Sequence, residues 1–363
     1  MASKQWPHIP NEAMRTFVIK CMESVGTKSA HAQVLAELLV TADYRGHYSH
    51  GLNRLDMYVK DMKTGMTVCD KEPEILKETV ATAWVDGNNV LGPVVGKFCM
   101  DLAIKKAKEV GVGWVTAKGS NHFGIAGWYS MRAAEQGLMG MAYTNTSPLV
   151  VPTRSKQKAI GTNPISVAAP GKEGDDFVLD MATSTVALGK IELNERKNIP
   201  LPNGWGCDGS GKESHDAGVV LREGGSFPLG GSEISGGYKG YGLSMMVEVF
   251  CGILSGGEYG PNIRRWKTTD RIANLGQCFV AVNPDSFAPG FEDRMSDLND
   301  LCRDLPKAEG ESEILVAGDP ERKHMKDCDD RGGIPYHPNQ IDYVKDMAAN
   351  LKVDLPTIVT PKE

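Results

Sequence analysis

The spacing of apolar residues changes near residue 80, and this change most limits how the chain can fold. The first 65 residues show only the spacing expected of amphipathic helices. From Val80 onward, short β-favouring runs alternate with helical segments, as they do in α/β proteins. We therefore predict an α/β fold preceded by a helical part. The first helices are expected at Asn11–Met22, Ser29–Arg45 and Leu52–Lys63.

The same patterns place the later elements and loops. Ile199–Ser235 is rich in Gly, Pro and Ser, which indicates a long surface excursion, and Asp319–Gly333 is expected to be a charged loop. The helix at Leu243–Leu254 is apolar almost all round, so we expect it to be buried. Strands are expected at Val80–Val85, Val112–Ala117, Leu138–Thr144, Phe177–Met181, Gln277–Val282 and Ile314–Ala317, and helices at Pro93–Val110, Ile125–Gln136, Thr183–Asn194, Phe291–Leu305 and Asn339–Leu351.

Composition excludes several classes of protein. The 363 residues are 41% hydrophobic, enough for a substantial core, and the net charge of −6 with scattered Lys and Arg argues against nucleic-acid binding. There is no apolar run long enough to span a membrane and no apolar signal core, so we expect a cytoplasmic protein without a membrane partner. Eight cysteines without a CxxC pair are interpreted as reduced core thiols.

A histidine follows one of the predicted strands directly. The stretch Val112–Gly127 contains a β-favouring run, a turn and the start of a helix, and His122 lies just past the strand. In open α/β sheets small ligands bind at this edge, because the strand holds the loop that follows it in a defined position. His122 is therefore a candidate site residue. The alternative is a histidine satisfied by hydrogen bonds in an ordinary turn.

A second group of polar residues lies between the second and third helices. The segment Arg45–Gly51 contains an arginine, two histidines and Ser49, and Arg54 follows one turn into the next helix, so its guanidinium can reach back to the same place. His47 and His50 are spaced like possible metal ligands, but no acidic residue or cysteine lies close by. We therefore predict no metal site.

Two further segments combine hydroxyls and amides with few charges. They are Asn145–Pro148 and Gly161–Pro164, and both follow apolar stretches. Such groups suit a neutral, polyhydroxylated ligand such as the ribose and carboxamide of a nicotinamide cofactor. The alternative is turn capping, because Asn, Thr, Ser and Pro are ordinary turn formers.

Two glycine-rich segments are candidates for phosphate binding. Gly204, Gly206 and Gly209 spell the GxGxxG string, but prolines precede it and no helix is expected after it, so we reject a Rossmann dinucleotide site there. Gly236–Gly242 instead leads into a helix, where main-chain N–H groups and Lys239 could bind an anion. A solvated lysine at a helix start explains the same pattern equally well.

Seven motifs, in this order, resemble the malate/L-lactate dehydrogenase family that lacks a Rossmann fold. Relatives in that family include ureidoglycolate, sulfolactate and diketogulonate dehydrogenases. The resemblance covers roughly residues 10 to 350. The motifs are RGHYSHG with Arg54, GSNHFG with His122, NTSPLVVP, GTNPISVAAPG, LDMATS, GGYKGYGLSMMVEVFCGILSGG and NLGQCFVAVNP.

The resemblance implies a homodimer. Each subunit would have a helical domain at 1–75, completed by 290–363, and a nicotinamide- and substrate-binding α/β domain at 76–289 with the excursion at 195–235. The α/β domain would have three layers around a mixed sheet of non-Rossmann topology. By motif, His122 would be the general acid/base, with Ser49, His50 and Arg54 contacting substrate. The cofactor contacts would be Thr146, Asp180, Met181, Ala182, Lys239, Asn274, Leu275 and Gly276.

The expected function is NAD(P)-dependent interconversion of a small 2-hydroxy acid, L-malate first, and its 2-keto acid. An imidazole titrates near working pH and can exchange the hydroxyl proton, and an arginine can hold a carboxylate with two parallel hydrogen bonds. NAD is the expected cofactor, with NADP as the alternative. A cofactor-free isomerase or lyase with His122 as base, and a non-catalytic metabolite-binding protein, remain competing interpretations.

Overall fold

A computed structural model describes residues 5–265 and 268–360, and its centre is a mixed sheet of seven strands. The strand order is β2-β3-β4-β10-β5-β6-β7, in which only β3 and β4 run parallel. The strands are β2 Glu74–Glu78, β3 Thr82–Asp86, β4 Val112–Ser120, β5 Met139–Thr144, β6 Ile165–Ala169, β7 Phe177–Met181 and β10 Leu275–Val282.

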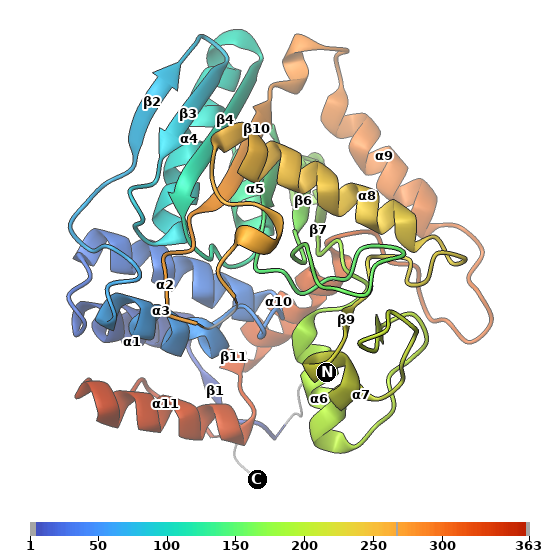
Figure 1. The fold of residues 1–363 in the computed structure, drawn as a ribbon. Coiled ribbons are helices and arrows are strands. Elements are labelled where there is room, and N and C mark those ends of the chain that lie inside the picture. The colour runs from blue at the N-terminus through green and yellow to red at the C-terminus, as the bar shows by residue number, and fades with distance from the viewer. Residues whose placement is uncertain (1–4, 266–267, 361–363) are drawn as a thin grey trace.

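Helices cover both faces of the sheet and produce three layers (Figure 1). Helix α4 (Gly92–Val110) connects β3 to β4 and packs with α5 (Gly127–Ala134) on one face. Helix α8 (Gly237–Glu248) and the π-helical turn η3 (Val249–Ile253) pack on the other face, against β4, β5 and β10. The predicted α/β fold class with a three-layer mixed sheet is therefore confirmed.

The N-terminal helices form a layer at one end of the sheet, joined by helices from the end of the chain (Figure 1). Helix α11 packs on α1 and α10 packs on α2, while β1 (His8–Ile9) pairs with β11 (Ile334–Pro335). One continuous apolar cluster runs from these helices to the inner face of α4. The helices are α1 Asn11–Glu23, α2 Ser29–Tyr44, η1 Leu52–Arg54, α3 Leu55–Lys63, α10 Asp319–Arg331 and α11 Pro338–Leu351.

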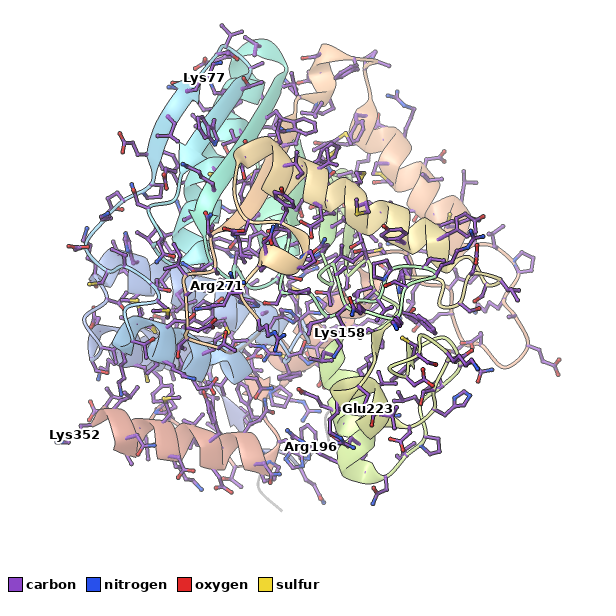
Figure 2. The ribbon with its side chains drawn as sticks, viewed as in Figure 1. Lys77, Lys158, Arg196, Glu223, Arg271 and Lys352 are labelled. Carbon is purple, nitrogen blue, oxygen red and sulfur yellow. The ribbon has the colours of Figure 1, made fainter. Side chains whose placement is uncertain are left out.

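The remaining segments lie beside the sheet. Residues 183–235 form a lobe with a small core of their own, and Arg196 and Glu223 mark it in Figure 2. Helix α9 (Phe291–Arg303) packs on the turn η2 (Lys172–Gly174) and is tied there by Arg303, whose guanidinium bonds Asp175 at 2.7 Å. The lobe contains α6 Leu188–Lys197, β8 Gly206–Cys207, α7 Ala217–Arg222 and β9 Gly225–Ser226; η4 (Gly260–Asn262) and η5 (Pro284–Ser286) flank β10 in the sequence.

Several local predictions are wrong. Asp319–Gly333 is not a loop, because acidic residues in its first turn, Arg331 in its last turn and pairs such as Arg331 with Asp327 stabilise the polar helix α10. Ile314–Ala317 forms no strand, and α6 begins at Leu188 rather than Thr183. The strands β2 and β6 were not predicted at all.

The helix expected to be buried all round is exposed along one face. It begins at Gly237, before the predicted start. One face of the helix packs on the sheet, and the other faces the surface. Val247 and Cys251 are buried against β5 and β10, whereas Met245, Val249 and Ile253 are 42%, 48% and 54% exposed. Its outward face lies open across the front of the sheet in Figure 1. The prediction of a buried helix is therefore wrong, because only one face of the helix is packed within this chain.

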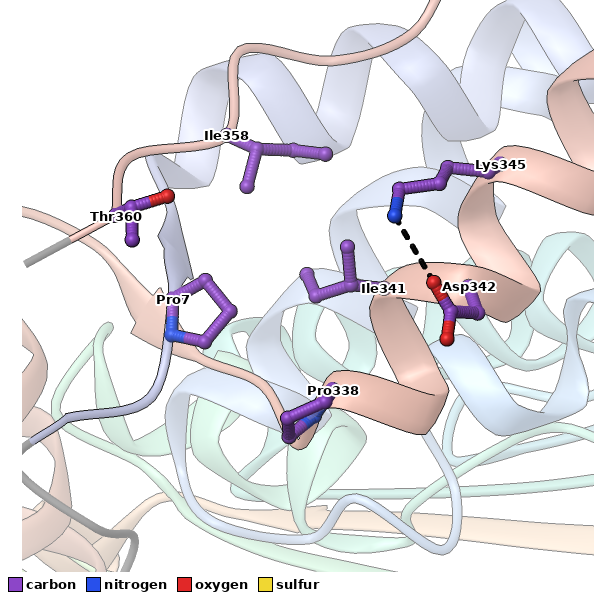
Figure 3. Close-up of a pocket in the computed structure, with 7 residues that line it drawn as sticks. All are labelled: Pro7, Pro338, Ile341, Asp342, Lys345, Ile358 and Thr360. Carbon is purple, nitrogen blue, oxygen red and sulfur yellow. Dashed lines mark hydrogen bonds and ion pairs between the residues drawn. The ribbon is translucent and has the colours of Figure 1, made fainter.

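All eight cysteines are free thiols, as predicted, and six of them are buried. Burial raises the pKa of the Cys21 thiol to about 12. No helix in the described ranges is long and apolar enough to cross a membrane. A surface cavity of about 370 Å³ lies between the N-terminal segment and α11, and its rim carries the ion pair of Lys345 with Asp342 at 2.9 Å (Figure 3). None of the residues around this cavity is a predicted site residue.

Candidate active site

His122 lies in the loop that joins β4 to α5, past the carboxyl end of the strand, as predicted. The strand runs on to Ser120, so the turn is shorter than expected. The main chain of the loop is tightly held, because the Gln277 side chain donates to the Asn121 carbonyl at 3.0 Å. A Cβ atom at Gly92 would lie 2.3 Å from the His122 carbonyl oxygen, so the first turn of α4 can approach this closely only with glycine there.

The imidazole of His122 is oriented by Tyr58, a residue that the sequence reasoning missed. The Tyr58 hydroxyl lies 2.7 Å from Nδ1 and 3.3 Å from the main-chain oxygen of His122. Tyr58 is 3% exposed and comes from α3, in the helical layer. It follows Arg54 by one helical turn, on the same face, and this spacing was the available signal.

The predicted substrate residues gather beside His122. The ring of His50 stacks on the His122 ring, with 5.8 Å between centroids and 17° between planes. The Ser49 hydroxyl lies 2.9 Å from His50 Nδ1, and Arg54 Nε donates to the Ser49 carbonyl at 2.6 Å. The structure therefore brings together the four residues predicted to touch substrate or its proton.

Asp43, another residue that the sequence did not indicate, supports this loop from beneath. Its Oδ2 accepts from the Leu52 N–H at 2.9 Å and from the Tyr336 hydroxyl at 2.8 Å. A Cβ atom at Gly51 would overlap its Oδ1 at 1.9 Å, so the loop packs directly onto the carboxyl group. Burial raises the pKa of Asp43 to about 7.

The electrostatic environment keeps both stacked histidines neutral. Burial lowers the pKa of His122 well below 6.5, and the charges of His50 and Arg54 lower it further. Burial, followed by Arg54 and His47, lowers the pKa of His50 to about 4. The expectation that this imidazole titrates near working pH is therefore wrong for the free protein, because burial disfavours the charged ring and the guanidinium of Arg54 adds to the effect.

The segment Asn274–Gly276 lies beside the His122 loop because β10 pairs with β4. Leu275 faces Ser120 in the register of the two strands. The Asn274 side chain accepts from the Gly119 N–H at 2.9 Å, and the Gly276 N–H donates to Asn145 at 3.0 Å. A cavity of about 320 Å³ opens at this place, lined by Asn274 and Gly119 and by Val68, Lys71, Asp86, Asn88, Asn89, Lys118, Gly256 and Ile272.

Hydrogen bonds connect the other predicted cofactor segments to one another. The Thr162 N–H donates to the Thr146 hydroxyl at 2.9 Å, and the Thr183 N–H donates to the Thr162 carbonyl at 2.8 Å. Thr183 follows Asp180, Met181 and Ala182 in the chain, so these three residues come to the same place.

Asp180 joins this group to the first turn of α5. Its Oδ2 accepts from the Gly127 N–H at 2.7 Å. A Cβ atom at Gly127 would lie 2.8 Å from that oxygen, so only glycine permits the contact. Burial raises the pKa of Asp180, and the nearby His47 opposes this shift. Asp180 therefore lies between the cofactor segments and the substrate loop.

Lys239 lies apart from this group in the described contacts. It is exposed in the first turn of α8, where its ammonium lies 5.9 Å from the centre of the Tyr238 ring. The helix itself is connected to the cofactor segments, because the Ser244 hydroxyl donates to the Gly161 carbonyl at 3.3 Å.

The residues present fit a nicotinamide cofactor. Thr146 and Thr162 offer hydroxyls, and the Asn274–Gly276 segment offers main-chain groups. Beside the His122 loop, the side-chain oxygens of Ser120, Asn121 and Gln277 are buried without a hydrogen-bond partner in the described structure. Buried oxygens usually have a partner, so a ligand that donates hydrogen bonds, as a carboxamide does, matches their chemistry. No group of three potential metal ligands occurs among the described residues, and His47 instead lies 3.4 Å from Glu321.

The GxGxxG string has no part in this arrangement. Gly204 lies in a turn, Gly206 in the two-residue strand β8, and Gly209 in a loop well before α7. The fingerprint needs a helix directly after it, so that its N-terminus meets the pyrophosphate. The rejection of a Rossmann site therefore holds in the structure.

Comparison with known proteins establishes the family. A profile of the malate/L-lactate dehydrogenase family matches residues 9–345. The chain belongs to this family. It is 37% identical to a malate dehydrogenase of Pyrococcus abyssi, over 96% of both chains. It is also 37% identical to an L-sulfolactate dehydrogenase of Methanocaldococcus jannaschii, over 95% of this chain and 97% of that protein.

A solved structure of this family has the same fold. The malate dehydrogenase of Pyrococcus horikoshii OT3 superposes with a TM-score of 0.89 at 34% identity, over 98% of both chains. The resemblance inferred from seven motifs is therefore confirmed at the level of the whole chain. The roles of individual residues in this member of the malate/L-lactate dehydrogenase family remain predictions.

Replacing Tyr58 with Phe tests whether its hydroxyl orients His122. We expect kcat to fall about 10-fold, the equivalent of about 1.4 kcal/mol for one hydrogen bond to a reacting group. Steady-state kinetics in both directions measures the effect. Tyr44→Phe is the matched control, because its hydroxyl bonds Asp329 on α10 at 2.8 Å, away from the site. Equal kcat in Tyr58→Phe and wild type would show that the hydroxyl does not orient the imidazole.

Proposed function

We propose that this protein is an NAD(P)-dependent oxidoreductase that interconverts a small 2-hydroxy acid and its 2-keto acid by hydride transfer. One observation carries the proposal: the imidazole of His122 is held by Tyr58 at 2.7 Å within a group that also contains His50, Ser49 and Arg54. An acid/base and a carboxylate-binding guanidinium are the protein groups that this reaction needs.

His122 exchanges the substrate's hydroxyl proton. In oxidation its Nε2 must carry a lone pair, so the proton of the neutral ring is on Nδ1. Nδ1 faces the Tyr58 hydroxyl at 2.7 Å and the Gly124 N–H at 3.3 Å. In the Nδ1–H tautomer the long contact with Gly124 is given up, and the Tyr58 hydroxyl accepts from Nδ1 and donates to the His122 carbonyl at 3.3 Å. Tyr58 thereby stabilises the tautomer that acts as a base. When the keto acid is reduced, the protonated ring returns the proton from Nε2.

Arg54 binds the carboxylate shared by all 2-hydroxy acids. Its guanidinium is placed by the bond from Nε to the Ser49 carbonyl. A bound carboxylate neutralises a charge that lowers the pKa of His122 in the free protein. Substrate binding therefore raises the proton affinity of His122 when a proton is needed for reduction.

The cofactor, when bound, accepts or supplies the hydride. Thr146, Asp180, Met181, Ala182 and the Asn274–Gly276 segment would hold it, since hydrogen bonds bring these segments beside the His122 loop. Lys239 would contribute its charge from the first turn of α8. Among the cofactors we propose NAD, with NADP as the alternative.

L-malate is the proposed substrate, because the relatives reported above include malate dehydrogenases. The test is a panel of 2-keto acids, including oxaloacetate, pyruvate and sulfopyruvate, with NADH and NADPH, followed at 340 nm. Oxaloacetate with NADH is expected to be fastest. Absence of any absorbance change would favour the isomerase or lyase. If a keto acid raised the thermal stability of the protein without turnover, the result would favour a metabolite-binding protein.

Arg54→Lys tests the carboxylate site within the same assay. The change keeps the charge but removes the planar pair of donors. We therefore expect kcat/KM to fall by the equivalent of about 1.5 to 3 kcal/mol of transition-state stabilisation. Arg15→Lys on α1 is the control, because among the described residues Arg15 pairs with Glu12 on its own helix. A near wild-type kcat/KM for Arg54→Lys would remove Arg54 from the substrate site.

The pH dependence tests the role of His122. Oxidation needs the neutral ring, and the pKa in the free protein is well below 6.5, so kcat/KM for oxidation should rise only in the acid range and be level by neutral pH. In reduction the ring must start protonated, so kcat/KM should fall as pH rises through the same range. His122→Asn should abolish both limbs and lower kcat by about 10²- to 10⁴-fold. Limbs that survive in His122→Asn would assign the titration to another group.

We also propose that the protein is a homodimer. The exposed apolar face of Met245, Val249 and Ile253 on α8 and η3 is the kind of surface that a second copy covers. Light scattering should give about twice the subunit mass of 39.3 kDa. Ile253→Glu should shift the mass toward that of the monomer, and a wild-type mass of one subunit would contradict the proposal.

The division of the chain into two domains is also a proposal. Residues 1–75 with 290–363 would form the helical domain and 76–289 the cofactor- and substrate-binding domain, with the 195–235 segment attached to the latter. A cytoplasmic location likewise stays a prediction.

A further inference from the structure

A buried carboxylate lies on the far side of the cofactor segments from His122. Glu248 is the last residue of α8 and is 4% exposed. Its Oε1 accepts from Asn163 Nδ2 at 2.9 Å, and its Oε2 accepts from Asn145 Nδ2 at 3.1 Å and from the Gly260 N–H at 3.4 Å. All its hydrogen-bond partners in the described part of the chain are neutral, so no cation compensates for its burial.

The two asparagines transmit this contact to the cofactor segments. Because both NH₂ groups face Glu248, both side-chain oxygens face the other way. Asn163 Oδ1 accepts from the Thr146 N–H, and Asn145 Oδ1 accepts from the Gly276 N–H, both at 3.0 Å. Each NH₂ group also donates to a main-chain oxygen, that of Asn163 to Ser244 at 3.1 Å and that of Asn145 to Glu258 at 2.7 Å. Among the described residues, Glu248 is the one group that contacts both amides, and each amide anchors a different segment predicted to hold the cofactor.

The backbone around Glu248 is built for this close approach. The π-helical turn η3 follows it directly, and such turns often occur at functional sites. A Cβ atom at Gly252 would lie 2.8 Å from Asn145 Nδ2, and one at Gly276 would lie 2.3 Å from the Cys251 carbonyl carbon. Neither glycine can be enlarged without moving the segments that Glu248 connects.

We infer that Glu248 is a positioning residue for the nicotinamide cofactor, acting through Asn145 and Asn163 on Gly276 and Thr146. The inference rests on the proposed function and adds to it a residue that touches neither substrate nor cofactor. Glutamine cannot replace the carboxylate, because its NH₂ would face one of the two asparagine NH₂ groups. That asparagine then loses its bond to residue 248 and keeps only the one to the Ser244 or Glu258 carbonyl, so its hold on Thr146 or Gly276 is weakened.

The test compares Glu248→Gln and Glu248→Asp with wild type in NADH titrations and steady-state kinetics. We expect the Kd and KM for NADH to rise about tenfold in Glu248→Gln, the equivalent of about 1.4 kcal/mol. The KM for the keto acid and the pH limbs of His122 should stay unchanged. Glu258→Gln is the matched control, because Glu258 joins this network through its main-chain oxygen, which accepts from Asn145 at 2.7 Å.

A double-mutant cycle with Asn145→Ala separates positioning from a general loss of stability. If Glu248 acts through Asn145, the two substitutions should be less than additive in NADH affinity. Glu248→Asp keeps the charge and serves as the readout if Glu248→Gln does not fold; its KM for NADH should rise at unchanged kcat. Wild-type KM for NADH in a folded variant, or equal changes in both KM values, would overturn the inference while leaving the proposed function intact. A wild-type protein that binds neither NADH nor NADPH would overturn both.

Discussion

The insertion of β10 between β4 and β5 is the constraint on which the site depends. This strand is buried along almost its whole length and pairs on both sides. Its first residues consequently lie beside the end of β4, so that Leu275 faces Ser120 and Gln277 reaches the loop of His122. Segments that are distant in the sequence meet because antiparallel pairing places the start of one strand at the end of its neighbour.

The site is assembled from three separate parts of the fold. The helical layer supplies Tyr58, Arg54 and the loop that rests on Asp43, and the sheet supplies His122 at a strand end. Helix α8 closes the opposite side through Glu248. Polar groups that are partly or wholly removed from water connect these parts. Their burial lowers the pKa of His122 and raises the pKa of Asp43 and Glu248.

Residue chemistry and local spacing were enough to predict which residues gather in much of the candidate site. Four predicted residues lie together, namely His122, His50, Ser49 and Arg54. They could be predicted because two of the loops carry unusually dense polar groups next to clear strand or helix ends. Tyr58, Asp43 and Glu248 were missed. Each lies within a helix pattern. The spacing of Tyr58 from Arg54 was a local signal, whereas an acidic residue such as Asp43 or Glu248 has no local feature that distinguishes it. The polar helix α10 was missed for a related reason, since its stability comes from ion pairs and packing rather than from an apolar stripe.

The sequence by itself determined the fold class, the family and the residue types proposed for the chemistry, because periodicity and motif order are properties of neighbouring residues. Only the tertiary structure decided how the proton affinity of His122 is tuned and which groups hold it in place. Burial, the nearby charge of Arg54 and the hydroxyl of Tyr58 all reach the imidazole through space, from elements that no local pattern connects. The same holds for the face of α8, since the sequence shows that a helix is apolar but not which of its sides the chain itself covers.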